Sequence, residues 1–296
     1  MRHYTIANVW LVWLVVCVQL ELVKAKPVST EEKENSDQQT DEFAIGEPLT
    51  QEEFASNITV REGEIESEDF IPWDKQDPGL FGGDMKLSGG KTGIVSLKER
   101  WPDALIPYTI SASYTPRQRE IIASAMNALH QNTCIRFVPR TSEKDYVRII
   151  KTGGGCWSEV GMIGLRQILS LDDRCILASI PGLVVHELMH TLGFYHEHQR
   201  PDRDEFVSIN LKNVEPKNRG YFQKMSEWDF LTLKFSYDYG SVTHYPSNAF
   251  AKDSKIPVIL KLKGKNPYIA NRKAVSPVDV EKLNDWYCGS SDDYLF

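Results

Sequence analysis

The stretch from His186 to His196, with the sequence HELMHTLGFYH, constrains the fold of this chain more than any other feature. Apolar residues precede the first histidine and separate the polar ones, a pattern typical of a buried helix. On a helix, His186 and His190 stand four residues apart and project side by side, so their imidazoles can chelate one zinc ion. Gly193 supplies a position where the helix can end and the chain can turn, which lets His196 return as a third ligand. Three protein ligands leave a fourth zinc position open, as a catalytic site requires.

Glu187 lies about 100° around the same helix from His186 and is too close in sequence to act as a further ligand. We expect its carboxylate to lie against a zinc-bound water, as general base and then as proton donor to the leaving amine. Zinc would lower the pKa of that water towards ~7 and polarise the carbonyl under attack. Three histidines, one glutamate and one glycine in this register arise by chance in roughly one chain in 10^5, which disfavours a core helix with two surface histidines.

The amino terminus has the composition of a secretory signal. Residues 1–25 begin with basic side chains, run apolar from Val9 to Val18 and end on small residues that suit a signal peptidase. The apolar run has about a dozen residues, short of the ~20 that a spanning helix needs, which favours a signal over a membrane anchor. We therefore expect a secreted protein without a membrane anchor.

The acidic residues are concentrated between residues 26 and 91. This range holds 17 Asp and Glu against 6 Lys and Arg, a net charge of −11, whereas residues 1–25 carry +1 and residues 92–296 carry +3. From Lys26 to about Asp77 the chain is rich in Glu, Asp, Ser and Gln, and we expect this stretch to be flexible by itself. Asn57 opens a glycosylation sequon within it. The small charge of the remainder, without a basic and aromatic stripe, argues against a nucleic-acid binder.

The cysteines indicate an oxidising compartment. Cys17 leaves with the signal, and an even number then remains, at Cys134, Cys156, Cys175 and Cys288. No pair has the close spacing of a zinc knuckle, so two disulfides are expected. Their spacing alone leaves three connectivities open.

Globular character begins near Trp101, and the sequence from there on predicts a mixture of helices and strands. Thr115 is a suitable cap for one helix, and Ser276 with Asp279 forms a capping box for another near the carboxyl terminus. Strands are expected at residues 106–110, 135–138 and 146–150. With 41% hydrophobic and 25% charged residues, the composition excludes a collagen, a coiled coil and a multi-span membrane protein.

The pattern HExxHxxGxxH, continued by Glu197 to Asp204, resembles the astacin family of zinc metalloendopeptidases, a branch of the metzincins. The resemblance covers roughly residues 81–288. It implies an α+β fold of two lobes, the upper with a twisted mixed sheet and two long helices, the lower mostly irregular with a C-terminal helix. It also implies one zinc ion per chain, with Glu187 as base and three ligands, His186, His190 and His196.

The resemblance also implies roles for three further positions. Glu197 corresponds to a buried acid that pairs with the new amino terminus after activation. The stretch from Tyr237 to Tyr245 resembles the family's Met-turn, and Tyr245 corresponds to the tyrosine that caps zinc at rest and then swings away to bond the oxyanion. Thr243 departs from the pattern, because a methionine is expected as a hydrophobic floor beneath the histidines. Its loss threatens packing and zinc affinity more than the chemistry.

The resemblance also implies the disulfides Cys134–Cys288 and Cys156–Cys175. Residues 155–158 resemble the edge strand beside the active site, where a peptide can add as an antiparallel strand. Glu159 stands there in place of the more usual tyrosine.

The acidic range acquires a function through the same resemblance. The sequence FGGD at residues 81–84 resembles an aspartate switch, in which Asp84 takes the place of the water on zinc in the latent form. Alignment on Trp101 puts the mature amino terminus near Thr92, and Lys91 suits a trypsin-like activating protease.

The resulting hypothesis is a secreted zinc endopeptidase, made as a zymogen and acting on polypeptide substrates. Its parts are a signal (1–25), an acidic propeptide (26–91) and a single catalytic domain (92–296), expected to be monomeric. The alternative is a zinc-binding pseudoprotease that acts as a binding or decoy protein. Thr243 is its only sequence support, while the presence of Glu187 and Tyr245 argues against it.

Overall fold

The computed structural model describes residues 44–61, 79–87, 99–226, 233–262 and 269–289, all within the second of two units of the chain, Thr40–Phe296. The expected signal and activation site lie outside the described residues. Within the described ranges, no helix is both long and apolar enough to cross a bilayer.

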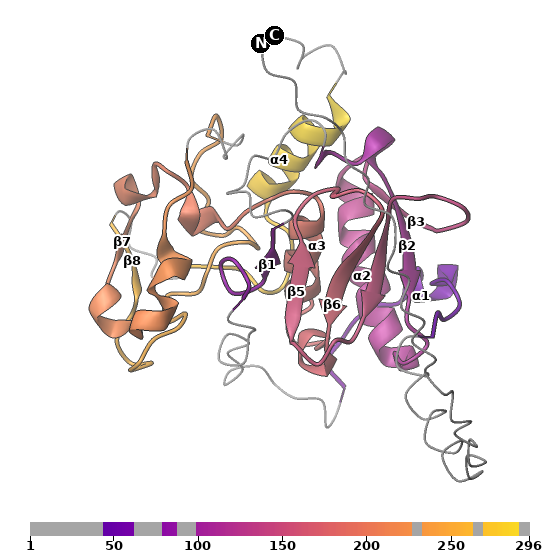
Figure 1. The fold of residues 1–296 in the computed structure, drawn as a ribbon, viewed down its shortest axis with the longest axis horizontal. Helices are drawn as coiled ribbons and strands as arrows, with labels where there is room; N and C mark the ends of the chain where they lie inside the picture. The colour runs from indigo at the N-terminus through magenta and orange to yellow at the C-terminus, as the bar shows by residue number, and fades with distance from the viewer. Residues whose placement is uncertain (1–43, 62–78, 88–98, 227–232, 263–268, 290–296) are drawn as a thin grey trace, which may run out of the picture. The chain divides into compact units, whose positions relative to one another are not determined.

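A mixed sheet forms the centre of the upper lobe (residues 99–192), as Figure 1 shows. In the described residues it has six strands in the order β1-β5-β6-β4-β2-β3. Only β5 and β6 are antiparallel, while the other neighbours are parallel. The strands are β1 (Met85–Lys86), β2 (Leu105–Ile110), β3 (Arg136–Pro139), β4 (Tyr146–Ile150), β5 (Cys156–Glu159) and β6 (Arg166–Leu171). The three strands expected from the sequence are present as β2, β3 and β4, and the expected α+β class is confirmed.

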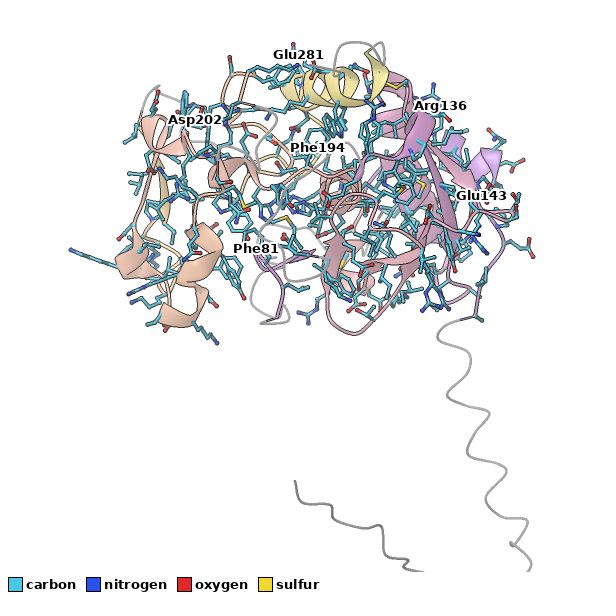
Figure 2. All side chains as sticks on the ribbon, turned by 45° about the horizontal axis from the view of Figure 1, so that its top comes forward. Phe81, Arg136, Glu143, Phe194, Asp202 and Glu281 are labelled. Carbon is cyan, nitrogen blue, oxygen red and sulfur yellow. A yellow bond between two sulfur atoms is a disulfide. The ribbon has the colours of Figure 1, made fainter. Side chains whose placement is uncertain are left out.

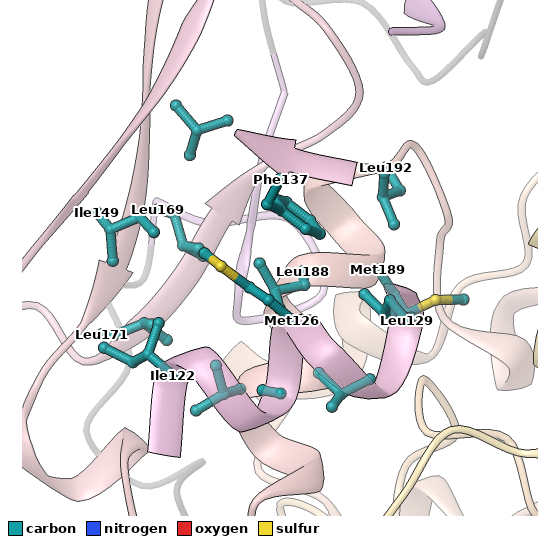
Figure 3. Close-up of a cluster of buried hydrophobic side chains, with 14 of the residues drawn as sticks. Ile122, Met126, Leu129, Phe137, Ile149, Leu169, Leu171, Leu188, Met189 and Leu192 are labelled. Atoms are coloured by element: carbon teal, nitrogen blue, oxygen red, sulfur yellow. The ribbon is translucent and has the colours of Figure 1, made fainter. Parts of the chain in front are cut away.

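Two helices pack against this sheet and against each other. Helix α2 (Pro116–Asn132) begins at the Thr115 cap, where the Thr115 hydroxyl and the Gln118 side chain form a capping box. Helix α3 (Gly182–Thr191) is buried along its whole length, which explains why it is mostly apolar on all sides, with His186, Glu187, His190 and Thr191 as its polar side chains. Each fully buried aliphatic side chain here contributes about 1.5–3 kcal/mol. Figure 3 shows this core, in which the labelled side chains are Ile122, Met126, Leu129, Phe137, Ile149, Leu169, Leu171, Leu188, Met189 and Leu192.

The lower lobe (residues 193–289) has little regular structure apart from its last helix, as expected. Strands β7 (Val207–Ile209) and β8 (Ile259–Lys261) form an antiparallel pair over a separate small core. Helix α4 (Pro277–Cys288) begins with the predicted capping box and packs Leu283 and Trp286 into the core of the upper lobe. Short 3-10 helices occupy Glu197–Gln199, Arg203–Glu205, Leu211–Asn213 and Pro216–Phe222 here, and Pro102–Ala104 and Asp173–Cys175 in the upper lobe.

Two disulfides fasten these elements, in the pairing that the family resemblance implies. Cys134, just after α2, is bonded to Cys288 at the end of α4, across 154 residues. Cys156 at the start of β5 is bonded to Cys175, across 19 residues. By chain entropy alone the longer loop is worth about 5 kcal/mol and the shorter about 3 kcal/mol.

Residues 44–61, which we call the anchor segment, lie on the upper lobe although the acidic range was expected to be flexible. Helix α1 (Gln51–Ala55) packs against α2. Arg119 of α2 donates to both carboxylate oxygens of Glu53 (2.6 and 3.1 Å) and to the carbonyls of Glu47 and Pro48 (2.9 and 2.8 Å). The Phe54 ring stacks on His130 at 5.5 Å. The segment cannot bury enough surface alone, but α2 supplies partners that an isolated chain lacks.

Candidate metal centre and active site

Helix α3 and the turn after it bring the three predicted histidines together. His186 and His190 lie on one face of α3, and Gly193, with φ +95°, lets the chain reverse so that His196 faces them. The His186 Nε2 atom lies 3.1 Å from that of His190 and 3.3 Å from that of His196. Ligand nitrogens of one tetrahedral zinc ion stand about 3.4 Å apart, so the spacing fits a shared metal.

Asp84 completes the cluster from outside the upper lobe. Its Oδ2 atom lies 3.0 Å from His186 Nε2 and 3.1 Å from His196 Nε2, and its Oδ1 atom lies 3.8 Å from His190 Nε2. All four side chains are fully buried, with their ligand atoms within 4.8 Å of one another. Asp84 therefore belongs to the same buried cluster as the three histidines.

The ring orientations leave the Nε2 atoms ready to bind a metal. His186 Nδ1 donates to the Val242 carbonyl (2.7 Å), and His190 Nδ1 donates to the Phe194 carbonyl (2.6 Å). Because a carbonyl can only accept, each Nε2 keeps its lone pair for a metal. Burial lowers the pKa of all three histidines, that of His186 to about 3, which favours the neutral form that binds metal.

Two buried carboxylate oxygens provide a separate test of the fit to zinc. Asp84 Oδ1 and Glu187 Oε2 have no hydrogen-bond partner among the described residues. Unpaired carboxylate oxygens are costly in a buried site unless a cation or a water bound to it meets them. Three imidazoles with one carboxylate form a common zinc donor set, and these residues therefore fit one zinc ion per chain.

Glu187 lies on α3 between the two helical ligands and is buried. Burial raises its pKa well above the usual range, the negative charge of Asp84 adds to this, and the positive charge of the half-buried Arg272 opposes it. Arg272 also donates to the Val242 carbonyl (2.6 Å), the same oxygen that orients His186. Arg272 is not predicted from the sequence, because no local motif marks a residue so far from α3 along the chain.

Tyr245 contacts the segment that carries Asp84. Its hydroxyl donates to the Gly82 carbonyl, its ring stacks on His198 at 3.9 Å, and burial raises its pKa so that the phenol stays a donor. Gly82 needs to be glycine, because its φ is +59° and a Cβ there would lie 2.8 Å from His196 Nδ1. Phe81, labelled in Figure 2, exchanges two backbone hydrogen bonds with Met85, so residues 82–84 form the tip of a tight loop.

Thr243, the departure from the family pattern, is 2% exposed. Its hydroxyl lies 2.9 Å from Ser241 Oγ, which donates to Asp279 at 2.7 Å. Asp279 also accepts from the Val242 N–H at 2.8 Å and so holds the turn beneath His186. The threonine hydroxyl is therefore hydrogen-bonded, and the turn is fixed from α4 without a methionine.

Glu197 is buried, which excludes a merely solvated charge. Its carboxylate pairs with Lys282 at 2.6 Å and with Arg200 at 3.2 Å, and accepts from the Asp238 N–H at 2.9 Å. The resemblance implies an amino-terminal amine as its partner in the active form. In this structure two cations neutralise it, Arg200 three residues further on and Lys282 of α4.

The family resemblance also predicts that a substrate peptide adds at the edge of the sheet, antiparallel to β5. Strand β1 occupies this edge in the parallel direction, with Met85 opposite Ser158. The Ser158 N–H donates to the Asp84 carbonyl (2.9 Å), and the Val160 N–H donates to the Lys86 carbonyl (3.3 Å). Asp84, next to this pairing, reaches the histidines with its side-chain carboxylate.

Comparisons with known proteins agree with this geometry. Residues 93–288 match the model of the Astacin family of peptidases. The chain is 41% identical over 205 residues to the zinc metalloproteinase nas-8 of Steinernema carpocapsae, which covers 68% of this chain and 48% of that relative. It is 35% identical over 290 residues to nas-7 of Caenorhabditis elegans, which covers 94% of this chain and 70% of that relative.

Among solved structures, the chain resembles high choriolytic enzyme 1, a hatching enzyme zinc-protease from the medaka fish Oryzias latipes. The TM-score is 0.58 at 35% sequence identity, over 64% of this chain and 92% of that one. The chain spans about half the length of several curated relatives, 48% of each nas-8 protein.

Proposed function

Because the chain belongs to the astacin family of zinc metallopeptidases, we propose that it is a secreted endopeptidase that hydrolyses polypeptides and is made as a latent precursor. The observation that carries this proposal is the buried cluster of Asp84 with three histidines, beside a buried Glu187 and a tyrosine hydroxyl. The cluster combines the donors of a catalytic zinc site with a carboxylate supplied by the acidic range.

The reaction follows from the placement of these side chains. When bound, zinc supplies a Lewis acid that lowers the pKa of a water and polarises the substrate carbonyl. Glu187 accepts a proton from the attacking water and delivers it to the leaving amide nitrogen. Tyr245, once released from the Gly82 carbonyl, donates a hydrogen bond to the substrate oxygen as that oxygen gains charge. The N–H groups of Ser158 and Val160 hold the substrate backbone as an added strand.

Latency rests on Asp84 and on the direction of β1. The Asp84 carboxylate fills the position that water and substrate need, and the backbone beside it is bound parallel to β5. A substrate is proposed to run antiparallel, so the prosegment occupies the same edge without offering a peptide bond for cleavage.

The proposed processing follows the sequence. Residues 1–25 act as a signal peptide, residues 26–91 as the propeptide with a glycan at Asn57, and residues 92–296 as the catalytic domain. A trypsin-like protease cuts after Lys91 and releases Thr92 as the new amino terminus. The two disulfides support an extracellular location. The enzyme is proposed to be a monomer.

The pseudoprotease alternative is not favoured. Its support was Thr243, and the hydroxyl of this residue is accommodated in the hydrogen-bonded turn held by Asp279. Glu187 and Tyr245, which the chemistry needs, are both present at the histidine cluster.

The test is cleavage of a denatured protein by the trypsin-treated chain after the trypsin has been inhibited. Activity should appear together with an amino terminus near Thr92, and it should be lost in Glu187→Ala and in the presence of a chelator. A correctly processed chain that holds one zinc ion and cuts nothing would overturn the proposal and favour the pseudoprotease.

A further inference from the structure

Glu159, at the end of strand β5, places a mostly buried carboxylate at the edge of the sheet. Its side chain is 11% exposed. The Oε2 atom accepts from the Ile168 N–H at 2.6 Å, which fixes the carboxylate in place. Because a buried carboxylate is stable only with further partners, this position favours a cation in front of its second oxygen.

That cation is Lys86 of the prosegment. The Lys86 ammonium lies 3.4 Å from Glu159 Oε1 and 5.3 Å from the centre of the Trp157 ring. Trp157 and Glu159 are two residues apart on β5 and share a face of the sheet. Ser158, on the opposite face, bonds to Thr191 of α3 at 2.8 Å. A carboxylate and an indole face therefore meet one ammonium group from two sides.

The pairing of β1 with β5 shows where this pair lies relative to the metal site. Asp84 reaches the histidines, and the next two residues pair with Ser158 and Glu159. Strand β5 therefore leads away from the metal site as residue number rises. A peptide antiparallel to β5 runs towards the metal site, so the residues that pass Glu159 precede the scissile bond.

We propose that Trp157 and Glu159 form a cation-binding subsite that selects lysine or arginine in substrates, within three residues on the amino-terminal side of the cut. This inference rests on the proposed endopeptidase function. Lys86 occupies the subsite in the latent chain, and a basic substrate side chain replaces it after activation. The carboxylate supplies the charge preference, and the indole face favours a flat or extended cationic side chain.

The first test is a cleavage profile of the activated enzyme on a peptide library, read by mass spectrometry. Lysine and arginine should be enriched at one position within three residues before the cut. Glu159→Gln, which keeps an acceptor for the Ile168 N–H, should lose this enrichment, and Glu159→Lys should replace it with aspartate or glutamate. Glu205→Gln, an exposed change on the lower lobe, is the matched control and should keep the wild-type profile.

Matched peptides give the magnitude. For a peptide with lysine at the selected position, kcat/KM should fall about 3- to 10-fold in Glu159→Gln, because the contact is partly exposed and screened. For the same peptide with norleucine, kcat/KM should not change. A wild-type profile without basic enrichment, or an enrichment that survives in Glu159→Gln, overturns the subsite. If the wild-type enzyme cuts neither peptide, the proposed function itself fails, and the two failures are thus distinct.

A binding measurement tests the same contact without turnover. The released prosegment is titrated against activated Glu187→Ala enzyme, by calorimetry. Lys86→Met should weaken binding about 3- to 10-fold, and the same change should have little further effect in Glu187→Ala enzyme that also carries Glu159→Gln. Independent effects of the two substitutions would show that Lys86 and Glu159 do not act as a pair.

Discussion

Replacing Gly82 by alanine should release the latent state while leaving the mature enzyme intact. The φ of +59° costs an alanine about 1–2 kcal/mol. The added Cβ would lie 2.8 Å from Nδ1 of the buried His196, and such crowding costs typically ~1–3 kcal/mol. Together these terms weaken docking of the prosegment by about 2–5 kcal/mol, which corresponds to roughly 30-fold or more in affinity.

The assay is inhibition of the activated enzyme by added prosegment, residues 26–91. The inhibition constant of the Gly82→Ala prosegment should rise about 30-fold or more over wild type. Its control is Gln51→Ala, an exposed change in α1 of the same prosegment, which should inhibit like wild type. A change of less than about threefold in Gly82→Ala would refute the argument, because it would mean that the loop does not dock against His196 as described.

Other consequences can be measured separately. Glu187→Gln should lower kcat by about 10²–10⁴-fold while the chain still holds one zinc ion by atomic absorption, and activity within tenfold of wild type would exclude Glu187 as the base. A chelator should abolish the activity of the mature enzyme, and one equivalent of zinc should restore it; activity that persists in metal-free protein contradicts the assigned centre. Arg119→Ala removes the hydrogen bonds to the anchor segment and should weaken the prosegment as an inhibitor by about tenfold, with kcat/KM unchanged. Burial raises the pKa of Asp279 to about 6, so the folded chain holds a proton there that the unfolded chain releases. From pH 4 to 6 the free energy of unfolding should thus fall by about 2 kcal/mol more in the wild type than in Asp279→Asn, and equal slopes would show that Asp279 does not titrate in this window.

The parts of the site that the sequence predicts are those encoded within a few residues of one another. The i and i+4 spacing of His186 and His190 acts within one turn of helix, and Gly193 ends that helix by its own backbone freedom. The capping boxes of α2 and α4 are likewise complete within four residues. These helix spacings, helix ends and capping boxes can be predicted from the sequence, because each is determined by neighbouring residues and not by distant contacts.

The parts that the sequence does not predict depend on partners far along the chain. The anchor segment is acidic and polar, and it is held in place by partners in the upper lobe, among them Arg119 and His130 of α2. Arg272 reaches the Val242 carbonyl from a stretch without a motif, and Lys282 of α4 neutralises Glu197 across 85 residues. These charged side chains find their partners only in the folded chain, where burial makes a partner necessary. Local sequence therefore does not indicate which residues pair.

The two attachments of the proposed prosegment, at the anchor segment and at Asp84, both precede Lys91, the proposed activation site, in the chain. A single cut after Lys91 therefore breaks one covalent link and none of these contacts. The product is a complex of two chains, and its dissociation is governed by dilution. Freshly cut protein should remain inactive in a concentrated compartment. It should become active, after a lag, once it is diluted. Latency in such a molecule is set by local concentration as much as by the protease that makes the cut.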